Sequence, residues 1–424
     1  MHMFREKVYQ KILPNGLSVI AIPNDDMEEC YLAWNVGCGS VDNTFHNSKE
    51  VHFYKNGTAK FLEYEMLERK IKIQAQKEES IPKKELLEEL KGYISSQTYK
   101  NYTNYYYKAN SKKFYKLMPI FLELMQKKIQ FYDNHEAERY LYRKVLLEEK
   151  SVFETLYNKT LKLMYRDKNI YLDNYGFKND NTTITEQELL NYYHDFYSPK
   201  NSIVVAYGNF DINTLTSMVR NSIYLKESNF NESSNEKQVK EYTEEKYSDY
   251  IELEDFSEKY FCFGIKLNPE SQEIAKRKIL MDIIIERYFG TRSQFQENIR
   301  GLVKQEDFKI IVENNKMFSH IMFVGKSNMR DEILNEIRKT LKRMSLDKEG
   351  LELAKRRVLF KLENDSFTNI NKNIVQSYFG DSREARNWLK KDDIDLMECY
   401  RLIESLKKAK IFVVKNQTII EGRN

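Results

Sequence analysis

The sequence is poor in cysteine, proline and long apolar runs. It has 4 cysteines and 6 prolines in 424 residues, and none of the cysteines is spaced as C-x-x-C. They are expected to be reduced thiols of a cytoplasmic protein rather than a disulfide framework. No stretch approaches the ~18–20 apolar residues that a membrane-spanning helix needs. The first residues also lack the apolar run of a signal peptide.

A strong excess of one charge is also absent. The chain has 68 Lys+Arg against 64 Asp+Glu, a net charge of +4. Nucleic-acid-binding proteins gather basic residues on one face, so this balance gives no reason to expect such a partner. Hydrophobic residues make up 41% and aromatic residues 13%, which is enough for a folded core. At about 150 residues per domain, the length suggests two large domains or three smaller ones.

Strand and helix patterns occur in the same order in both halves of the chain. The first half is predicted to contain strands at 17–23, 31–36, 98–109 and 203–207 and helices at 57–69, 111–130, 135–166 and 186–196. The second half is predicted to contain strands near 249–267, 308–325 and 411–414 and helices at 271–288, 329–345 and 348–364. Thr185 and Glu188 form a capping-box pattern at the start of one of these helices.

The repeated order predicts an α+β fold of two similar lobes, each a mostly antiparallel sheet flanked by helices. Residues 1–225 are expected to form the N-terminal lobe and residues 247–424 the C-terminal lobe. Between them, residues 226–246 are rich in Ser, Asn, Glu and Lys and nearly devoid of apolar side chains. This composition is typical of a linker.

The segment from Asn56 to Glu68 carries the most specific pattern in the chain. It resembles the zinc-site helix of the insulinase/pitrilysin-type metallopeptidases, which has the order H-x-x-E-H. In that family the two histidines lie four residues apart on one helical face and hold zinc, and the glutamate activates a water molecule. Lys60 and Tyr64 stand at the two histidine positions. The residues around them that match the family are Gly57, Ala59, Phe61, Leu62 and Glu63.

The resemblance extends well beyond this helix. Residues 15–17 resemble the family's opening, residues 39–43 the turn before the zinc helix, and residues 196–208 the segment that closes the first family domain. Residues 145–149 resemble the helix that supplies the third zinc ligand. The resemblance assigns that ligand position to Glu149, with Glu148 and Lys150 left open as alternatives. The length suits the bacterial two-lobed branch of the family, in which two such chains pair.

The two replaced histidines are expected to abolish zinc binding. Zinc needs an unprotonated lone pair from each ligand, and deprotonating a lysine and a tyrosine at neutral pH costs roughly 8–9 kcal/mol together. Structural zinc sites gain on the order of 10–16 kcal/mol in total. We therefore expect no zinc, no other cofactor and no hydrolysis by the family mechanism. One hypothesis is that Lys60, lying among Glu63 and Glu149, replaces zinc as the compensating charge; an ordinary i,i+3 ion pair is the alternative.

Other positions that the resemblance implies also depart from the family. The substrate-lining Ala-Asn-Ala edge strand corresponds to residues 95–97, and the Arg and Tyr of the second lobe correspond to Glu297 and Lys304. Relatives dock a peptide by strand addition, which makes Ser96, Tyr99 and Tyr102 candidate peptide contacts. The alternative for this tyrosine-rich segment is a packed aromatic face. A relocated metal site at His46 and His52 is disfavoured, because the two lie six residues apart with no cysteine nearby.

The resemblance therefore implies a catalytically inactive homologue of a zinc metallopeptidase. We expect it to be the non-catalytic subunit of a heterodimer with an active H-x-x-E-H chain, or a peptide-binding module. By family analogy, such a partner processes peptides, for instance modified leader peptides, in a bacterium. Two alternatives remain open. One is a zinc endopeptidase with an altered site that uses Glu63 and Glu149, and the other is a homodimeric peptide-binding scaffold.

Overall fold

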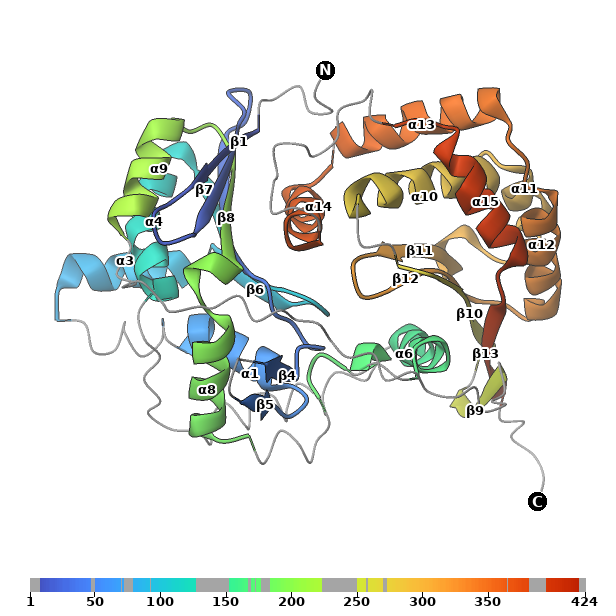
Figure 1. Ribbon diagram of the computed structural model, residues 1–424, viewed down its shortest axis with the longest axis horizontal. Coiled ribbons are helices and arrows are strands. Elements are labelled where there is room, and N and C mark those ends of the chain that lie inside the picture. The colour runs from blue at the N-terminus through green and yellow to red at the C-terminus, as the bar shows by residue number, and fades with distance from the viewer. Residues whose placement is uncertain are drawn as a thin grey trace. The chain divides into compact units, whose positions relative to one another are not determined.

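The computed structural model divides the chain into two compact units (Figure 1). The N-unit consists of Glu6–Glu149 and Leu172–Val239, and the C-unit of Met1–Arg5, Lys150–Tyr171 and Lys240–Asn424. The structure describes residues 8–46, 50–69, 71, 79–91, 93–126, 152–166, 169–171, 173–176, 184–222, 250–256, 258–269, 273–363, 365–380 and 394–418.

The N-unit contains a six-stranded sheet in the order β1-β2-β8-β3-β7-β6. The strands are β1 (Tyr9–Ile12), β2 (Ser18–Pro23), β3 (Glu29–Val36), β6 (Ile94–Thr98), β7 (Thr103–Asn110) and β8 (Ser202–Gly208). All neighbours are antiparallel except β2 and β8. Gly16, at φ 88°, forms the turn that leads into β2. The edge position of β6 leaves one side of this strand without a described strand partner.

The helices of the N-unit build one core against this sheet. They are α1 (Thr58–Tyr64), α3 (Ile81–Lys91), α4 (Ser111–Gln126), α8 (Glu186–Phe196) and α9 (Ile212–Asn221), with a small sheet of β4 (Thr44–His46) and β5 (Val51–Phe53). Tyr107 of β7 stacks on Phe114 of α4 and meets Phe121 at a tilt, with ring centroids 5.4 and 5.0 Å away. These aromatic contacts join α4 to the sheet.

The C-unit contains a five-stranded sheet in the order β11-β12-β10-β13-β9. The strands are β9 (Tyr250–Phe256), β10 (Tyr260–Leu267), β11 (Phe308–Asn314), β12 (Ser319–Lys326) and β13 (Ile411–Thr418). Only the pair β9 and β13 is parallel. The helices are α6 (Val152–Met164), α10 (Ile274–Phe289), α11 (Gln294–Ile299), α12 (Arg330–Arg343), α13 (Lys348–Glu363), α14 (Phe367–Gly380) and α15 (Glu398–Lys408).

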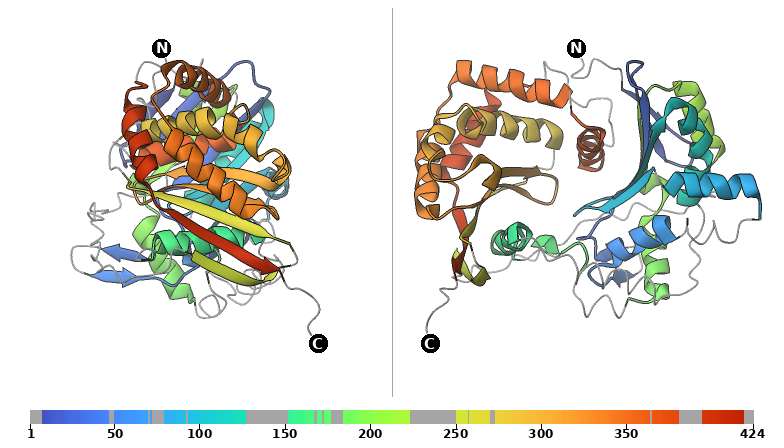
Figure 2. Two further views of the ribbon diagram at one scale, coloured as in Figure 1. Left: turned by 90° about the vertical axis from the view of Figure 1, so that its right-hand side faces the viewer. Right: turned by 180° about the vertical axis from the view of Figure 1, so that it is seen from behind.

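Helices cover both faces of the C-unit sheet (Figure 2). On one face, Phe323 of β12 contacts Phe289 of α10, with ring centroids 4.9 Å apart. On the other face lies α6. A Cβ atom at Gly264 of β10 would stand 2.6 Å from the Thr160 side chain of α6, so glycine permits the close approach of helix and strand.

The α+β prediction is confirmed, with a mainly antiparallel sheet and flanking helices in each unit. The unit boundaries differ from the predicted lobes, because the described residues 152–166 and 169–171, predicted in the N-terminal lobe, belong to the C-unit. The hydroxyl of Tyr165, which follows α6, donates to the carbonyl of Ser319 at 2.7 Å. An amphipathic pattern shows that a helix covers a sheet but not which sheet it covers. The predicted linker at 226–246 lies outside the described residues.

Two local predictions also need correction. The strand predicted at 98–109 is the second half of a hairpin, in which β6 pairs with β7 and a turn at 99–102 joins them. The helix predicted at 57–69 is α-helical only to Tyr64 and continues as a π-helical turn, Glu65–Arg69. The strands predicted near 249–267 are β9 and β10, and those predicted near 308–325 are β11 and β12. None of the described helices is long and apolar enough to cross a membrane.

His320 of β12 is buried beneath α6. Its two ring nitrogens lie 3.2 Å from the hydroxyl of Tyr165 and 3.3 Å from that of Tyr157. Burial lowers the pKa of His320 to about 4, with an opposing contribution from the charge of Glu313. The imidazole is therefore neutral in the folded C-unit at physiological pH.

This burial predicts an acid-dependent loss of stability. In the unfolded chain, His320 takes up a proton as the pH falls below an ordinary histidine pKa of about 6.5. In the folded chain it stays neutral until about pH 4, so acid favours the unfolded state. The free energy of unfolding should thus fall with pH across this window, by on the order of 3 kcal/mol. His320→Gln should remove that slope in chemical denaturation curves recorded from neutral to acidic pH. His194→Gln, at a side chain 90% exposed, is the control, and parallel curves for wild type and His320→Gln would contradict the prediction.

Candidate functional site

The turn before α1 is held by a carboxylate from another helix. Gly57 adopts φ 92°, and Glu188 of α8 accepts hydrogen bonds from the Lys55 amide at 2.8 Å and the Thr58 hydroxyl at 3.2 Å. Thr185 caps α8 by accepting from the Glu188 amide at 3.2 Å, as predicted. In a capping box the glutamate side chain also bonds back to the start of its own helix; here the Glu188 carboxylate bonds to the α1 turn instead. Glu188 therefore fixes α1 against α8.

Lys60 and Glu63 form a buried ion pair on α1. The Lys60 ammonium lies 2.7 and 2.8 Å from the two Glu63 carboxylate oxygens. The two residues are 8% and 2% exposed. An ammonium and a carboxylate at i and i+3 meet on one helical face, and burial here removes the water that would otherwise screen them.

Edge strand β6 completes the hydrogen bonding of Glu63. Ser96 donates its hydroxyl proton to Oε1 at 2.8 Å, and Thr98 donates to Oε2 at 2.5 Å. Each carboxylate oxygen thus accepts two hydrogen bonds, one of them from Lys60. A carboxylate offers about four acceptor positions in all, so Glu63 has no acceptor left for a proton from water.

The segment Asp173–Gly176 covers the ion pair. The Tyr175 ring lies over the Lys60 ammonium, with its centroid 5.5 Å away, a cation–π arrangement. Asn174 donates to the carbonyl of Thr98 at 2.8 Å and accepts from the Ser40 hydroxyl at 2.8 Å. Gly176, at φ 72°, lies so close to Asn56 that a Cβ atom would meet the Asn56 carbonyl at 2.3 Å. Sequence reasoning missed this cover, whose only local signal is the glycine.

Two tyrosines, Tyr105 and Tyr197, lie within the electrostatic influence of the Glu63 carboxylate. The hydroxyls of Tyr105 and Tyr197 are 2.7 Å apart. Burial raises the pKa of both phenols well above the ordinary value, and the Glu63 charge adds to this rise. Both phenols are therefore neutral at physiological pH. The charged pair of α1 is that of Lys60 and Glu63.

The donors at this site do not fit a zinc ion. The first histidine position is filled by an ammonium that both Glu63 oxygens already bind. Tyr64, at the second position, packs half-buried against the hydrophobic core. Glu149, Glu148 and Lys150 lie outside the described residues, so their part in the charge balance stays a prediction. Within the described part of the chain, no three His, Cys, Asp or Glu side chains are grouped to hold a metal.

Of the candidate peptide contacts, Ser96 lies on an edge strand, whereas Tyr102 is buried. Ser96 lies on edge strand β6, but its hydroxyl is directed to Glu63. Tyr102 is 1% exposed, and Tyr99 stacks on it with ring centroids 4.4 Å apart. The burial of Tyr102 removes it from the candidate contacts, and the packed aromatic face describes this part of the segment better. The exposed side chains of β6 are Ser95 and Gln97.

The remaining sequence candidates lie apart from the ion pair. Nδ1 of His52 is 2.6 Å from the buried Asp195 carboxylate, which also accepts a bond from Tyr54. This hydrogen bond is the main cause of a raised His52 pKa, and it joins β5 to α8. Glu297 and Lys304 are exposed residues of the C-unit.

Comparisons with known proteins identify the class of this fold and site. A family model described as "Peptidase M16 inactive domain" matches residues 183–358. Protein HypA of Clostridium perfringens is 23% identical over 333 residues, which cover 67% of this chain and 33% of that protein. This chain therefore spans about a third of HypA. The uncharacterized zinc protease YmfH of Bacillus subtilis is 22% identical over 376 residues, which cover 83% of this chain and 82% of that protein.

The fold comparison agrees with the sequence comparison. An M16-like peptidase from Alicyclobacillus acidocaldarius superimposes with a TM-score of 0.78 at 19% identity, over 97% of this chain and 98% of that one. The chain is similar to M16 peptidases in sequence and has their fold, the insulinase/pitrilysin type that the sequence resembles. Within that fold, the zinc-site helix carries the Lys60–Glu63 ion pair.

Removing Lys60 alone should be costly. Lys60→Met leaves a buried carboxylate without its counter-ion and is expected to lower the free energy of unfolding by about 3–5 kcal/mol. Lys60→Met/Glu63→Gln should recover most of this loss, because the neutral amide still bonds to Ser96 and Thr98. Urea denaturation followed by circular dichroism measures both changes.

A matched control is available on α3. Lys91 makes a similar pair with Glu88, at 2.7 Å, but both side chains are largely solvent-exposed. Lys91→Met is therefore expected to leave the denaturation midpoint unchanged. Equal effects of Lys60→Met and Lys91→Met would show that the buried pair has no special role.

Proposed function

We propose that this chain is a catalytically inactive M16 homologue that acts as the non-catalytic subunit of a heterodimeric peptide-processing protease. The observation that carries the proposal is the hydrogen bonding of Glu63. The residue that activates water in the family pattern accepts from Lys60, Ser96 and Thr98, and the Lys60 ammonium lies where a metal ligand would be needed. Hydrolysis by the family mechanism then has neither its metal nor its base.

Peptide binding is the second part of the proposal. Strand β6 is an edge strand with the exposed side chains of Ser95 and Gln97, and an extended peptide can pair with such an edge. The partner would be a chain with an intact H-x-x-E-H, in a bacterium, and leader-peptide processing is the suggested context. We place the complex in the cytoplasm because the four cysteines are unpaired, buried thiols.

The purified chain should contain no zinc and cleave no peptide. Metal analysis after incubation with zinc and removal of the excess should give far less than one equivalent. A fluorogenic peptide library should remain uncut. The variant Lys60→His/Tyr64→His restores two family ligands and is expected to raise the bound zinc. If the wild-type chain held one equivalent and lost it in Glu63→Gln/Glu149→Gln, an altered-site zinc endopeptidase would replace the proposal.

The partner can be found directly. We expect the tagged chain, purified from its native cells and examined by native mass spectrometry, to carry one stoichiometric second subunit with an H-x-x-E-H sequence. A proline substitution on exposed β6, Gln97→Pro, should reduce peptide capture by the pair, because proline blocks strand addition. A homodimer without a second polypeptide would instead support the peptide-binding scaffold. A monomer without peptide would overturn both forms of the proposal.

A further inference from the structure

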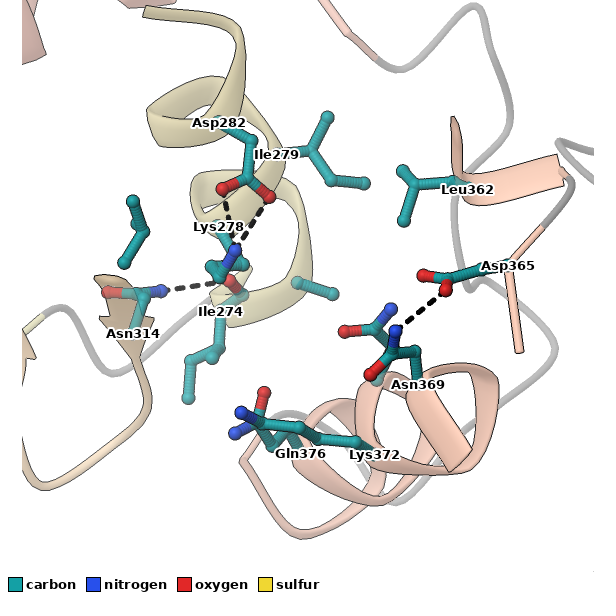
Figure 3. A pocket seen from close by; sticks show the side chains of 13 residues that line it. Ile274, Lys278, Ile279, Asp282, Asn314, Leu362, Asp365, Asn369, Lys372 and Gln376 are labelled. Carbon is teal, nitrogen blue, oxygen red and sulfur yellow. Dashed lines mark hydrogen bonds and ion pairs between the residues drawn. The ribbon is translucent and has the colours of Figure 1, made fainter. Parts of the chain in front are cut away.

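A cavity of about 230 Å³ lies wholly in the C-unit (Figure 3). Its walls are the first half of α10, the end of β11, Leu362 of α13 and one face of α14. None of its lining residues belongs to the Lys60–Glu63 site, which is part of the N-unit.

Three of the four charged residues that line the cavity, Lys278, Asp282 and Lys372, form ion pairs, and the fourth, Asp365, accepts from the Asn369 carboxamide. The Lys278 ammonium binds both oxygens of Asp282 at 2.6 Å, as the dashed lines in Figure 3 mark. Lys372 binds the Glu313 carboxylate at 3.0 Å. An anion would have to separate one of these pairs, and a cation would have to compete with Asn369 for the Asp365 carboxylate. The cavity therefore favours an uncharged ligand.

One face of α14 lines the cavity with carboxamides. Asn369, Asn373 and Gln376 follow at i, i+4 and i+7, so their side chains share a helical face. Asn369 donates to Asp365 at 2.7 Å. The carboxamides of Asn373 and Gln376 make no hydrogen bond to any residue in the described part of the chain, and Oδ1 of Asn314, which also lines the cavity, is buried without a partner there. A buried acceptor in this situation needs a donor from outside the protein.

The partner of a carboxamide is a group with a donor and an acceptor side by side. A peptide-type amide has both, because its N–H can bind the carboxamide oxygen and its C=O can accept from the NH₂ group. The apolar side chains of Ile274, Ile279 and Val312 also line the cavity and can pack against the carbon atoms of such a ligand. None of the described lining residues is aromatic, so the cavity offers no stacking surface for a base or a sugar ring. At about 30 Å³ for each water-sized atom, it holds roughly eight heavy atoms.

We propose that this cavity binds an uncharged peptide-type amide about the size of one capped amino-acid residue, held by Gln376 and Asn373 of α14. This amide-binding proposal rests on the proposed peptide-binding function and makes it more specific. It assigns a second peptide contact to the C-unit, made through side chains rather than through the edge of a strand.

N-acetylglycinamide, which has eight heavy atoms and no charge, is the probe. Saturation-transfer NMR with the full chain should detect its binding, and acetate and glycinamide, with single charges, should bind more weakly. Asn373→Leu/Gln376→Leu keeps the side-chain volume and should raise the dissociation constant about tenfold or more. Gln305→Leu changes an exposed glutamine outside the cavity and should have no effect. If the double variant does not fold, Asn373→Ala at a half-buried position replaces it.

Wild-type binding that is unchanged in the α14 variants would overturn the assignment, and so would the absence of binding by N-acetylglycinamide. Failure here is distinguishable from failure of the proposed function. A chain that captures a peptide and an H-x-x-E-H partner but ignores the amide would contradict only the cavity. A chain that binds the amide through α14 but captures neither would contradict only the proposed function.

Discussion

The buried ion pair between Lys60 and Glu63 is the interaction around which the described N-unit site is arranged. It joins the three parts of the site, because Glu63 lies on α1, its hydroxyl donors lie on β6, and Tyr175 covers the ammonium. A buried pair is not a strong source of stability by itself, since desolvation offsets most of the Coulomb attraction. Its importance lies in the cost of losing one member. Each partner therefore requires the other, and both require the surrounding donors.

The same pair explains why the motif around it can resemble an enzyme without providing the chemistry of one. Glu63 keeps the position that the family uses for the general base, but its lone pairs are directed to Lys60, Ser96 and Thr98. A general base needs a free acceptor and a water molecule whose proton it can take. The retained glutamate is thus better understood as the counter-ion of Lys60 than as a remnant of catalysis.

The sequence could predict what depends on local pattern. The α1 motif, the β2 strand and the cap at Thr185 follow from residues close to one another, and the resemblance to the family rests on such segments. What it could not predict depends on contacts distant in sequence. Glu188 serves two helices, Tyr175 covers a lysine more than a hundred residues earlier, and α6 joins the C-unit sheet through Gly264. Neither helical period nor burial pattern specifies which partner a buried face will meet.

The two units place polar groups in their interiors in different ways, and this difference bears on function. In the N-unit, the opposite charges of Lys60 and Glu63 satisfy one another at the position that corresponds to the family's catalytic glutamate. In the C-unit, the buried His320 finds two tyrosine hydroxyls, whereas Oδ1 of Asn314 is buried without a partner among the described residues. Polar atoms that remain unsatisfied in a folded interior are costly, and the position of Asn314 beside a cavity gives a ligand a way to remove that cost. By this reasoning, the part of the protein able to gain most from binding a small molecule is not the helix that resembles an active site.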